Sequence, residues 1–553
     1  MNTTLFRTLR GRLTPAADAR NHEGAPAYSL TPKQALAQMA ATGTLNATFY
    51  ASAEAQLDAI LALAAEVEPE FVARTAIVAR EQGYMKDVPA LLAAHLAVRD
   101  VKLLERVFPR VIDNARMLRG FVQILRSGAV GRKSLGSAPK RMVRDWLASR
   151  SDAALFRASV GSAPSLADIV KMVHPRPATA SRRALYAYLI GREHDARALP
   201  EIVQAYEAFK AEPLAHPVPD VPFQMLASLA YPTPEAERAV WAEIARTAPW
   251  HATRMNLNAF ARHGAFTVPG VAETVAARLS DPEAIRRARV FPYQLFVAWA
   301  QTDGAQTGGG VPHHTGFGRF VRKTASPEAS GAEHAVPALV RDALQDAMEI
   351  AISNVPALGG RVVVCPDVSG SMQSPATGYR RGSTSAVRCV DVAALVAASV
   401  LRKNPRARVL PFEHRVVDAR LNARDSVVTN AQRLAAVGGG GTDCSAPLAQ
   451  LVREGAPVDL VFFVSDNESW VDARNGRHGT ATMQAWNQLK ARNPGAKLVC
   501  LDIQPYRTVQ AQPREDILHV GGFSDRVFEV VAAFASGETG ADHWVGRIEA
   551  LSI

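Results

Sequence analysis

The chain has few cysteines, few aromatic residues and no long run of uncharged apolar residues. Its 553 residues include only 4 cysteines, too few for a disulfide framework, and none lies in a CxxC pair or another metal-ligand spacing. No uncharged apolar run reaches the roughly 18 residues that a membrane-spanning helix needs. We therefore expect a protein of the reducing cytoplasm with no membrane partner.

Several catalytic signatures are also missing. The sequence has no GxSxG elbow for a hydrolase, and its glycine run GGGGTD lacks the Gly-Lys-Ser/Thr of a phosphate loop. The basic N-terminus lacks the apolar core of a secretory signal. Aromatic residues make up 7% of the chain, so stacking on nucleic-acid bases cannot be extensive. We expect a protein that is not an enzyme.

The net charge and the pattern of apolar residues indicate the character and the division of the chain. The formal net charge is +11, which is weak support for a polyanionic partner. Up to about residue 300, apolar residues recur three and four positions apart in Ala- and Leu-rich segments, which predicts stacked helix pairs. Residues 301–337 are rich in Gly, Ser and Thr and are expected to form a linker.

After Gly360 the pattern changes to apolar, β-rich runs that alternate with helical stretches. This alternation predicts βαβ units, and strands that are apolar on both faces indicate a parallel sheet between helix layers. We therefore expect a helical domain over residues 1–340 and a doubly wound α/β domain over residues 341–553. In such sheets, ligands bind at the carboxyl ends of the strands.

The segment RVVVCPDVSGSM places oxygen-bearing side chains where a buried strand stops. Asp367, Ser369 and Ser371 occupy every second position, and Gly370 between the serines is expected to supply backbone freedom. Thr442 follows a four-glycine turn, and Asp466 ends another apolar run. Hard oxygen ligands with few charges suit Mg²⁺, with Mn²⁺ or Ca²⁺ as substitutes.

Two other interpretations of this segment were weighed. It could cap a helix, with Ser and Asp oxygens accepting from backbone N–H groups. It could also carry the nucleophile of a haloacid-dehalogenase-type phosphatase, but such an enzyme needs a second acid where Ser369 stands. The companion oxygens at the other strand ends favour the metal site.

The motif resembles the metal-ion-dependent adhesion site of von Willebrand factor A domains. That resemblance implies that Ser369, Ser371 and Thr442 bind the ion directly or through water, and that Asp367 and Asp466 act mainly through water. It also implies an open coordination position for a partner's carboxylate. Asp443 would lie just outside the ligand set.

Several segments together resemble the Ro60/TROVE family, whose bacterial members are called Rsr. They are the helix and strand ALVRDALQDAMEIAISNVPALGGRVVVCPDVSGSM, the closing HVGGFSDRVFEVVAAFASG, and DIVKMVHPRP, NATFYAS and VFPYQLFVAW in the helical part. Phe291 stands where the family usually has His. The resemblance implies a ring of HEAT-like helical repeats followed by the von Willebrand A domain.

The family's known biology gives specific expectations for partners. In these proteins, single-stranded 3′ ends of misfolded or processed RNA enter the positively charged hole of the ring. Small structured Y RNAs bind the outer basic surface, and bacterial relatives tether the exoribonuclease polynucleotide phosphorylase. The resemblance therefore implies a monomeric RNA-binding protein of RNA quality control or processing, with Y-like RNA as a partner.

Basic residues in the helical part are the candidates for RNA contact. Such residues neutralise phosphates without reading bases. They are Arg132, Lys133, Lys140, Arg141, Arg144, Arg157, Lys171, His174 and Arg176. Lys171, His174 and Arg176 match the family's outer RNA-binding segment, whereas Gly161 replaces a basic residue that commonly lines the hole.

A second hypothesis belongs to another class of protein. The chain could be an adaptor that captures an acidic protein partner through its metal ion, with the helices as a scaffold. Nucleic acid that co-purifies with the protein would discriminate the two hypotheses.

Overall fold

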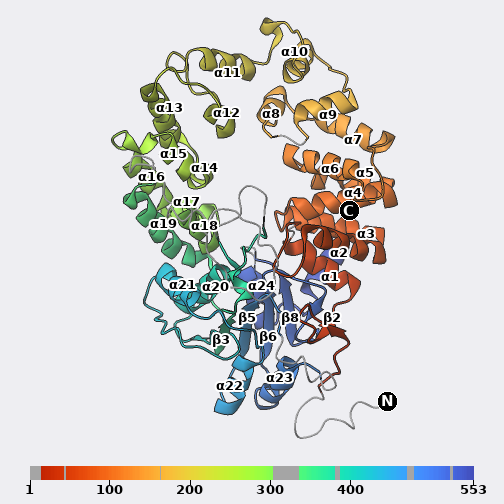
Figure 1. Cartoon of the computed structure of the whole chain (residues 1–553), viewed down its shortest axis with the longest axis vertical. Coiled ribbons are helices and arrows are strands. Elements are labelled where there is room, and N and C mark those ends of the chain that lie inside the picture. Colours follow the sequence, from red (N-terminus) through yellow and green to blue (C-terminus); the bar gives the residue numbers. More distant parts are fainter. Residues whose placement is uncertain are drawn as a thin grey trace. The chain divides into compact units, whose positions relative to one another are not determined.

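The computed structural model describes residues 14–42, 45–161, 164–302, 335–379, 387–469, 479–523 and 527–553 (Figure 1). It confirms the predicted order of a helical part followed by an α/β part with a parallel sheet. The chain forms two compact units. The first unit takes the described residues of Met1–Ile60, Pro249–Asn258 and Ala272–Arg547, and the second takes those of Leu61–Ala248, Ala259–Val271 and Ile548–Ile553.

The first unit is built on a parallel sheet of five strands in the order β4-β3-β5-β6-β8. Its strands are β3 (Val362–Pro366), β4 (Arg408–Val409), β5 (Leu460–Ser465), β6 (Lys497–Asp502) and β8 (Ile517–Gly521). The residues of β3 and β5 are buried throughout, as the unbroken apolar runs predict. The chain adds β4 on one side of β3 and β5 on the other, so the strand order reverses between β3 and β5.

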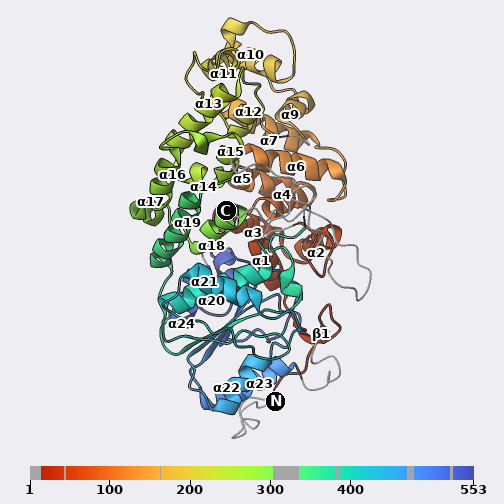
Figure 2. The same ribbon diagram turned by 60° about the vertical axis from the view of Figure 1, so that its left-hand side comes forward.

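Helices cover both faces of this sheet. They are α20 (Cys389–Lys403), α21 (Val427–Ala436), α22 (Ala446–Glu454), α23 (Ala481–Arg492), α24 (Val527–Ser536) and α25 (His543–Glu549). α20 and α21 lie on the side opposite to α22 and α23 (Figures 1 and 2). Alternate strand residues such as Cys365, Phe463 and Cys500 share one core cluster with Leu448 and Trp486 of α22 and α23.

The N-terminal segment belongs to the sheet unit, which differs from the predicted boundary at residue 340. β1 (Ala19–Arg20) and β2 (Pro26–Ser29) form a small antiparallel sheet with β7 (Thr508–Val509). α1 (Pro32–Thr42) contacts β8, and its buried Gln38 donates to the His519 carbonyl at 2.6 Å. The segment joins this unit because its buried polar groups find their partners there.

The last helices of the predicted helical domain also pack in the sheet unit. They are α14 (Trp250–Met255), α16 (Val271–Leu279), α17 (Pro282–Arg287), α18 (Pro292–Thr302) and α19 (Ala338–Ala351). α19 contacts α17, α18 and α21. Most of the linker predicted over residues 301–337 lies outside the described residues.

The second unit consists of helices that mostly contact their near neighbours along the chain (Figure 2). They are α2 (Ala53–Glu66, which begins in the first unit), α3 (Pro69–Glu81), α4 (Asp87–Arg99), α5 (Val101–Val111), α6 (Ala115–Ser127), α7 (Ser137–Ala148), α8 (Asp152–Arg157), α9 (Leu166–Val173), α10 (Ala180–Leu189), α11 (Glu201–Ala211), α12 (Phe223–Ala227), α13 (Pro234–Thr247) and α15 (Leu257–Arg262).

Local sequence sets the ends and the buried faces of these helices. Asp100 accepts from the Leu103 N–H and so caps α5, and Asn114 caps α6 in the same way. Gly128 ends α6 in the left-handed conformation. Neighbour-to-neighbour packing agrees with the predicted helix pairs, whereas closure into a ring stays a prediction.

Among the described residues, no helix combines the length and the apolar character that crossing a bilayer requires.

Candidate metal site and basic cavity

The five predicted metal ligands gather at the carboxyl ends of β3 and β5, where the strand order reverses. Asp367, Ser369 and Ser371 follow β3, and Asp466 follows β5. Thr442 lies on the loop before α22. All five side chains are buried, with exposures between 0% and 7%. A crevice outside the strand ends at such a reversal is the usual ligand position in an open α/β sheet.

Hydrogen bonds hold these oxygens close together. Asp367 accepts from the Ser369 N–H at 2.9 Å and from the Ser465 hydroxyl at 2.5 Å. The hydroxyl oxygens of Ser369 and Ser371 lie 3.3 Å apart, and Ser371 is also hydrogen-bonded to Asp466. The arrangement therefore offers hydroxyl and carboxylate oxygens around one small volume.

The electrostatics of the site favour a cation. Burial raises the pKa of Asp367, and burial together with the charge of Asp367 raises the pKa of Asp466 well above its usual value. Among the described residues, no positively charged group is recorded as lowering the pKa of either buried carboxylate. Within the described ranges, no group of three or more His, Cys, Asp or Glu side chains could hold a metal, so these mixed hydroxyl and carboxylate donors are the candidate set. Oxygen donors of this kind fit Mg²⁺.

Backbone hydrogen bonds connect the loop that carries Thr442 to the loop after β3. The Gly370 N–H donates to Gly440 and the Gly439 N–H donates to Val368, both at 2.9 Å. Gly370 has ordinary right-handed φ and ψ, so the predicted need for backbone freedom is wrong there. Its missing side chain matters instead, because a Cβ would stand 3.3 Å from the Gly439 carbonyl oxygen.

Replacing Gly438 by alanine should destabilise this loop strongly. Gly438 has φ +89°, and an added Cβ would approach the Val368 carbonyl oxygen to 2.2 Å. We expect a loss of roughly 2–4 kcal/mol in the free energy of unfolding, measured by urea denaturation. Gly359→Ala is the control, because a Cβ there meets nothing within 4 Å. Equal stability of the two variants would contradict the close approach at Gly438.

The N-terminal segment adds side chains to the metal site that the sequence analysis missed. The Tyr50 hydroxyl is hydrogen-bonded to Ser371. Glu468, two residues after Asp466, accepts from the backbone N–H of His22 at 2.9 Å and contacts its ring at 3.1 Å. The sequence could have indicated Glu468, because this residue lies on the same loop as the predicted ligand Asp466. The sequence gives no indication of His22 or Tyr50, because only the tertiary fold brings these residues to the site.

Asp443 does not join the ligand set in this arrangement. Its carboxylate accepts from the Ser445 N–H at 2.9 Å and from the Ser445 hydroxyl at 2.6 Å.

Asn467 takes a left-handed conformation with φ +63° directly after Asp466. Non-glycine residues in this conformation carry strain, which is often found at binding sites.

A second candidate site is a cavity of about 890 Å³ in the helical unit. Three of the predicted RNA-binding residues line it, namely Arg144 on α7 and His174 and Arg176 after α9. Arg182 of α10 lines it as well, but this side chain is paired with Asp152. Arg144, His174 and Arg176 are all exposed at the rim of the cavity, and Asp145 and Asp152 line it as well, so the rim carries both basic and acidic side chains.

Short-range structure explains how His174 reaches this rim. It ends α9 in the left-handed conformation, with φ 49° and ψ 63°, and its N–H donates to Val170 at 3.0 Å. Arg144 donates from Nε to the Val173 carbonyl, which ties α7 to the end of α9. The turn and the helix therefore hold His174 beside Arg144.

The other predicted RNA-binding residues do not line the cavity. Lys140 and Arg141 share α7 with Arg144, but Arg141 is paired with Glu105. Arg157 is paired with Asp220. Arg132 donates to the Ala97 carbonyl at 3.3 Å, while Lys133 and Lys171 are exposed. The RNA-binding role of all nine residues stays a prediction.

Comparison with known proteins shows what this chain is similar to. A protein-family model described as the Ro60 vWA domain matches residues 361–535. A protein of Deinococcus radiodurans named "RNA-binding protein RO60" is 27% identical over 94% of this chain and 95% of its own length. This chain is similar to a Ro60 protein over nearly its whole length.

Two further relatives support the resemblance. A Caenorhabditis elegans protein named "RNA-binding protein RO60" is 24% identical over 48% of this chain and 37% of its own length. The crystal structure of the Deinococcus radiodurans RO (RSR) protein matches with a TM-score of 0.59 at 23% identity, covering 92% of this chain and all of that one. The resemblance to the Ro60 family that the motifs predicted is thereby confirmed.

The structure gives a reason for the glycine that departs from the Ro60 pattern. Gly161 has φ +107°, and a Cβ there would stand 2.8 Å from a guanidinium nitrogen of Arg119. Arg119 in turn donates to the Ala158 carbonyl at 3.0 Å. The space that a side chain at position 161 would fill is therefore occupied by a basic group from α6.

Proposed function

We propose that this protein binds RNA through its basic helical unit. The Y-like structured RNA is proposed to contact the cavity of Arg144, His174 and Arg176, and single-stranded 3′ ends of misfolded or processed RNA are proposed to bind in the central hole of the ring that the family resemblance implies. The observation that carries the proposal is that Arg144 of α7 lines the same solvent-open cavity as His174 and Arg176 from the turn after α9. The names of the relatives, which describe them as RNA-binding proteins, support RNA as the ligand.

The chemistry of the cavity suits a structured RNA backbone. Exposed guanidinium groups bind phosphates through paired hydrogen bonds and carry little sequence information. The exposed His174 ring adds a hydrogen-bonding and stacking group beside them. We propose that this site selects RNA by shape and charge, within a role in RNA quality control or processing.

The α/β unit is proposed to bind Mg²⁺ at Asp367, Ser369, Ser371, Thr442 and Asp466. A bound ion would neutralise the two buried carboxylates and could offer a coordination position to a partner's carboxylate. We propose that this unit docks a protein partner, with polynucleotide phosphorylase as a candidate, and that the protein acts as a cytoplasmic monomer. In the adaptor alternative, this docking would be the whole function.

Salt dependence tests the electrostatic mechanism. We expect the affinity for a small structured RNA to fall steeply as the salt concentration rises, because bound counterions are released from each neutralised phosphate. A filter-binding series between about 50 and 200 mM salt measures the slope. The absorbance ratio at 260 and 280 nm of the freshly purified protein reports co-purifying nucleic acid. A flat salt series and no nucleic acid would favour the adaptor.

A further inference from the structure

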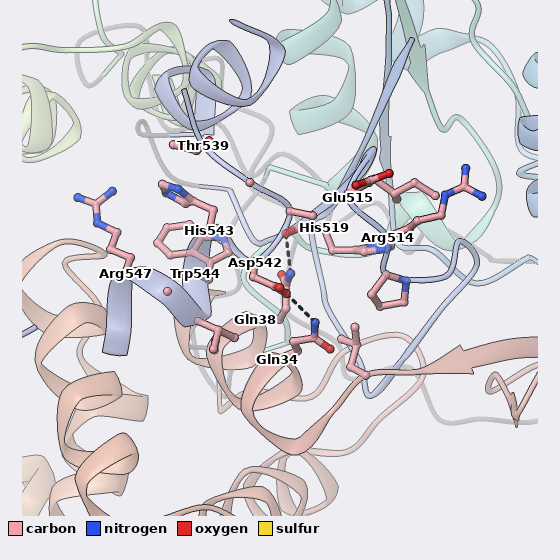
Figure 3. A pocket seen from close by; sticks show the side chains of 18 residues that line it. Gln34, Gln38, Arg514, Glu515, His519, Thr539, Asp542, His543, Trp544 and Arg547 are labelled. Carbon is pink, nitrogen blue, oxygen red and sulfur yellow. Dashed lines mark hydrogen bonds between the residues drawn. The ribbon is translucent and has the colours of Figure 1, made fainter. Parts of the chain in front are cut away.

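A second cavity, of about 740 Å³, lies in the sheet unit between α1, β8 and α25 (Figure 3). None of the predicted metal ligands or RNA-binding residues lines it. In the view of Figure 3, His543 and Trp544 lie on one side, Arg514 and Glu515 on the other, and Gln38 between them. The two sites described above therefore do not account for this cavity.

The lining carries buried polar atoms without hydrogen-bond partners among the described residues. They are Gln38 Oε1, Thr539 Oγ1, His543 Nε2, Trp544 Nε1 and the two ring nitrogens of His519. A buried polar atom left without a partner costs about 1–3 kcal/mol, and native proteins satisfy most of them. Six such atoms, from α1, from β8 and from residues 539–544, belong to the lining of one cavity and indicate a ligand that supplies their partners.

Gln38 is the best-fixed member of this group. Its side chain is 6% exposed, and its amide nitrogen donates to the His519 carbonyl at 2.6 Å. This bond fixes which end of the amide is the oxygen, because an oxygen at that position would face another acceptor. Gly521 lies against the same side chain, where a Cβ would come within 2.5 Å of Oε1. Gln38 therefore lines the cavity with its amide held in place, and its acceptor oxygen lies next to Gly521 without a hydrogen-bond partner among the described residues.

The remaining groups define the chemistry of the ligand. Trp544 offers an aromatic surface and an N–H donor, and the His543 ring lies edge-on to it at 5.4 Å. Thr539 can donate or accept. Apolar residues such as Leu30, Ala37, Ile517 and Val545 complete the lining. A flat ring with donors and acceptors on its edge matches this set better than an aliphatic or a highly charged molecule does.

The charges around the cavity point to a neutral ligand. Arg514 and Arg547 are balanced by Glu515 and Asp542, and Asp542 accepts from Gln34 at 3.0 Å. Arg514 is itself paired with Asp516 at 2.5 Å. The cavity therefore has no excess of positive charge that would select a phosphate group.

We propose that this cavity binds a nucleobase, stacked near Trp544 and hydrogen-bonded on its edge by Gln38 Oε1, Thr539 Oγ1 and Trp544 Nε1. The base could come from a free nucleoside or from an unpaired nucleotide of an RNA chain, since both present the same ring. A bound base would form hydrogen bonds with these unpartnered atoms. The gain of those hydrogen bonds would supply the free energy of binding.

Isothermal titration calorimetry with the full-length protein tests the proposal. The four ribonucleosides are titrated separately, each up to about 1 mM, followed by a short unstructured oligoribonucleotide. We expect at least one nucleoside to bind, and Trp544→Phe and Thr539→Val each to weaken its affinity about tenfold, because each removes one hydrogen bond. Neither variant loses a hydrogen bond present in the described structure, so both should fold.

Trp250→Phe is the matched control. Trp250 belongs to the same unit but does not line the cavity, and its indole N–H already donates to Leu279 at 3.3 Å. Binding of the nucleoside alone would identify a free metabolite as the source, and tighter, Trp544-sensitive binding of the oligonucleotide would identify RNA. The proposal would be overturned if neither a nucleoside nor the oligonucleotide gave a heat of binding that depends on Trp544 and Thr539. Loss of RNA binding at the Arg144 cavity would leave these outcomes unchanged.

Discussion

Combined replacement of Arg144 and Arg176 by glutamine and of His174 by alanine should lower the affinity for a small structured RNA by about a hundredfold or more at low salt. The three side chains are exposed around one cavity, so one RNA segment could contact them together. Each hydrogen bond to a charged group contributes about 1.5–3 kcal/mol, which sets the size of the expected loss. A filter-binding or fluorescence-anisotropy titration measures it.

A matched double variant separates this cavity from general attraction by positive charge. Lys133 and Lys171 are exposed, were predicted as RNA-binding residues and lie outside the cavity. The double variant Lys133→Gln and Lys171→Gln should make the RNA affinity less dependent on salt concentration and should weaken RNA binding only modestly. An equal loss in the two variants would contradict a localised site and leave a diffuse electrostatic surface.

Replacement of Asp466 by asparagine should abolish the stabilisation that Mg²⁺ gives to the α/β unit. A ligand present at about a hundred times its dissociation constant stabilises a protein by about 2.7 kcal/mol, which a thermal denaturation series with and without Mg²⁺ detects. The metal-free variant should be at least as stable as the metal-free wild type, because the substitution removes one of two buried carboxylate charges.

Asp443→Asn provides the control for this prediction. Its carboxylate is engaged by Ser445, and an amide oxygen can accept the same hydrogen bonds. The control should therefore keep the full response to Mg²⁺. A normal Mg²⁺ response in the Asp466 variant would remove Asp466 from the ligand set, and no response in the wild-type protein would contradict the metal site altogether.

The clustering of the candidate metal ligands could be predicted because these residues follow strands whose signals are strong. Buried apolar runs locate β3 and β5, and parallel strands bring their carboxyl ends to one edge, so Asp367 and Asp466 had to be close. The contribution of Tyr50 and His22 could not be predicted in this way. They reach the site through long-range packing of the N-terminal segment, and no local pattern encodes such packing.

The basic residues of the helical unit show the same limit more strongly. Charge and helical spacing identified Lys140, Arg141 and Arg144 on one helix, and the structure confirms that they share α7. Whether a cation faces solvent or pairs with an acid depends on the neighbouring helix. Arg141 meets Glu105, while Arg144 turns to the end of α9 and lines the cavity.

The sequence by itself determined the helical and α/β parts, the strand-end oxygens and the resemblance to the Ro60 proteins, because these depend on local periodicity and short motifs. Tertiary structure alone decided that the described residues among the first sixty pack with the sheet and that Arg144, His174 and Arg176 share one cavity. It also decided that Gln38 and Trp544 enclose another cavity. These outcomes depend on which distant surfaces bury one another, and that choice is made by the summed packing of the whole chain.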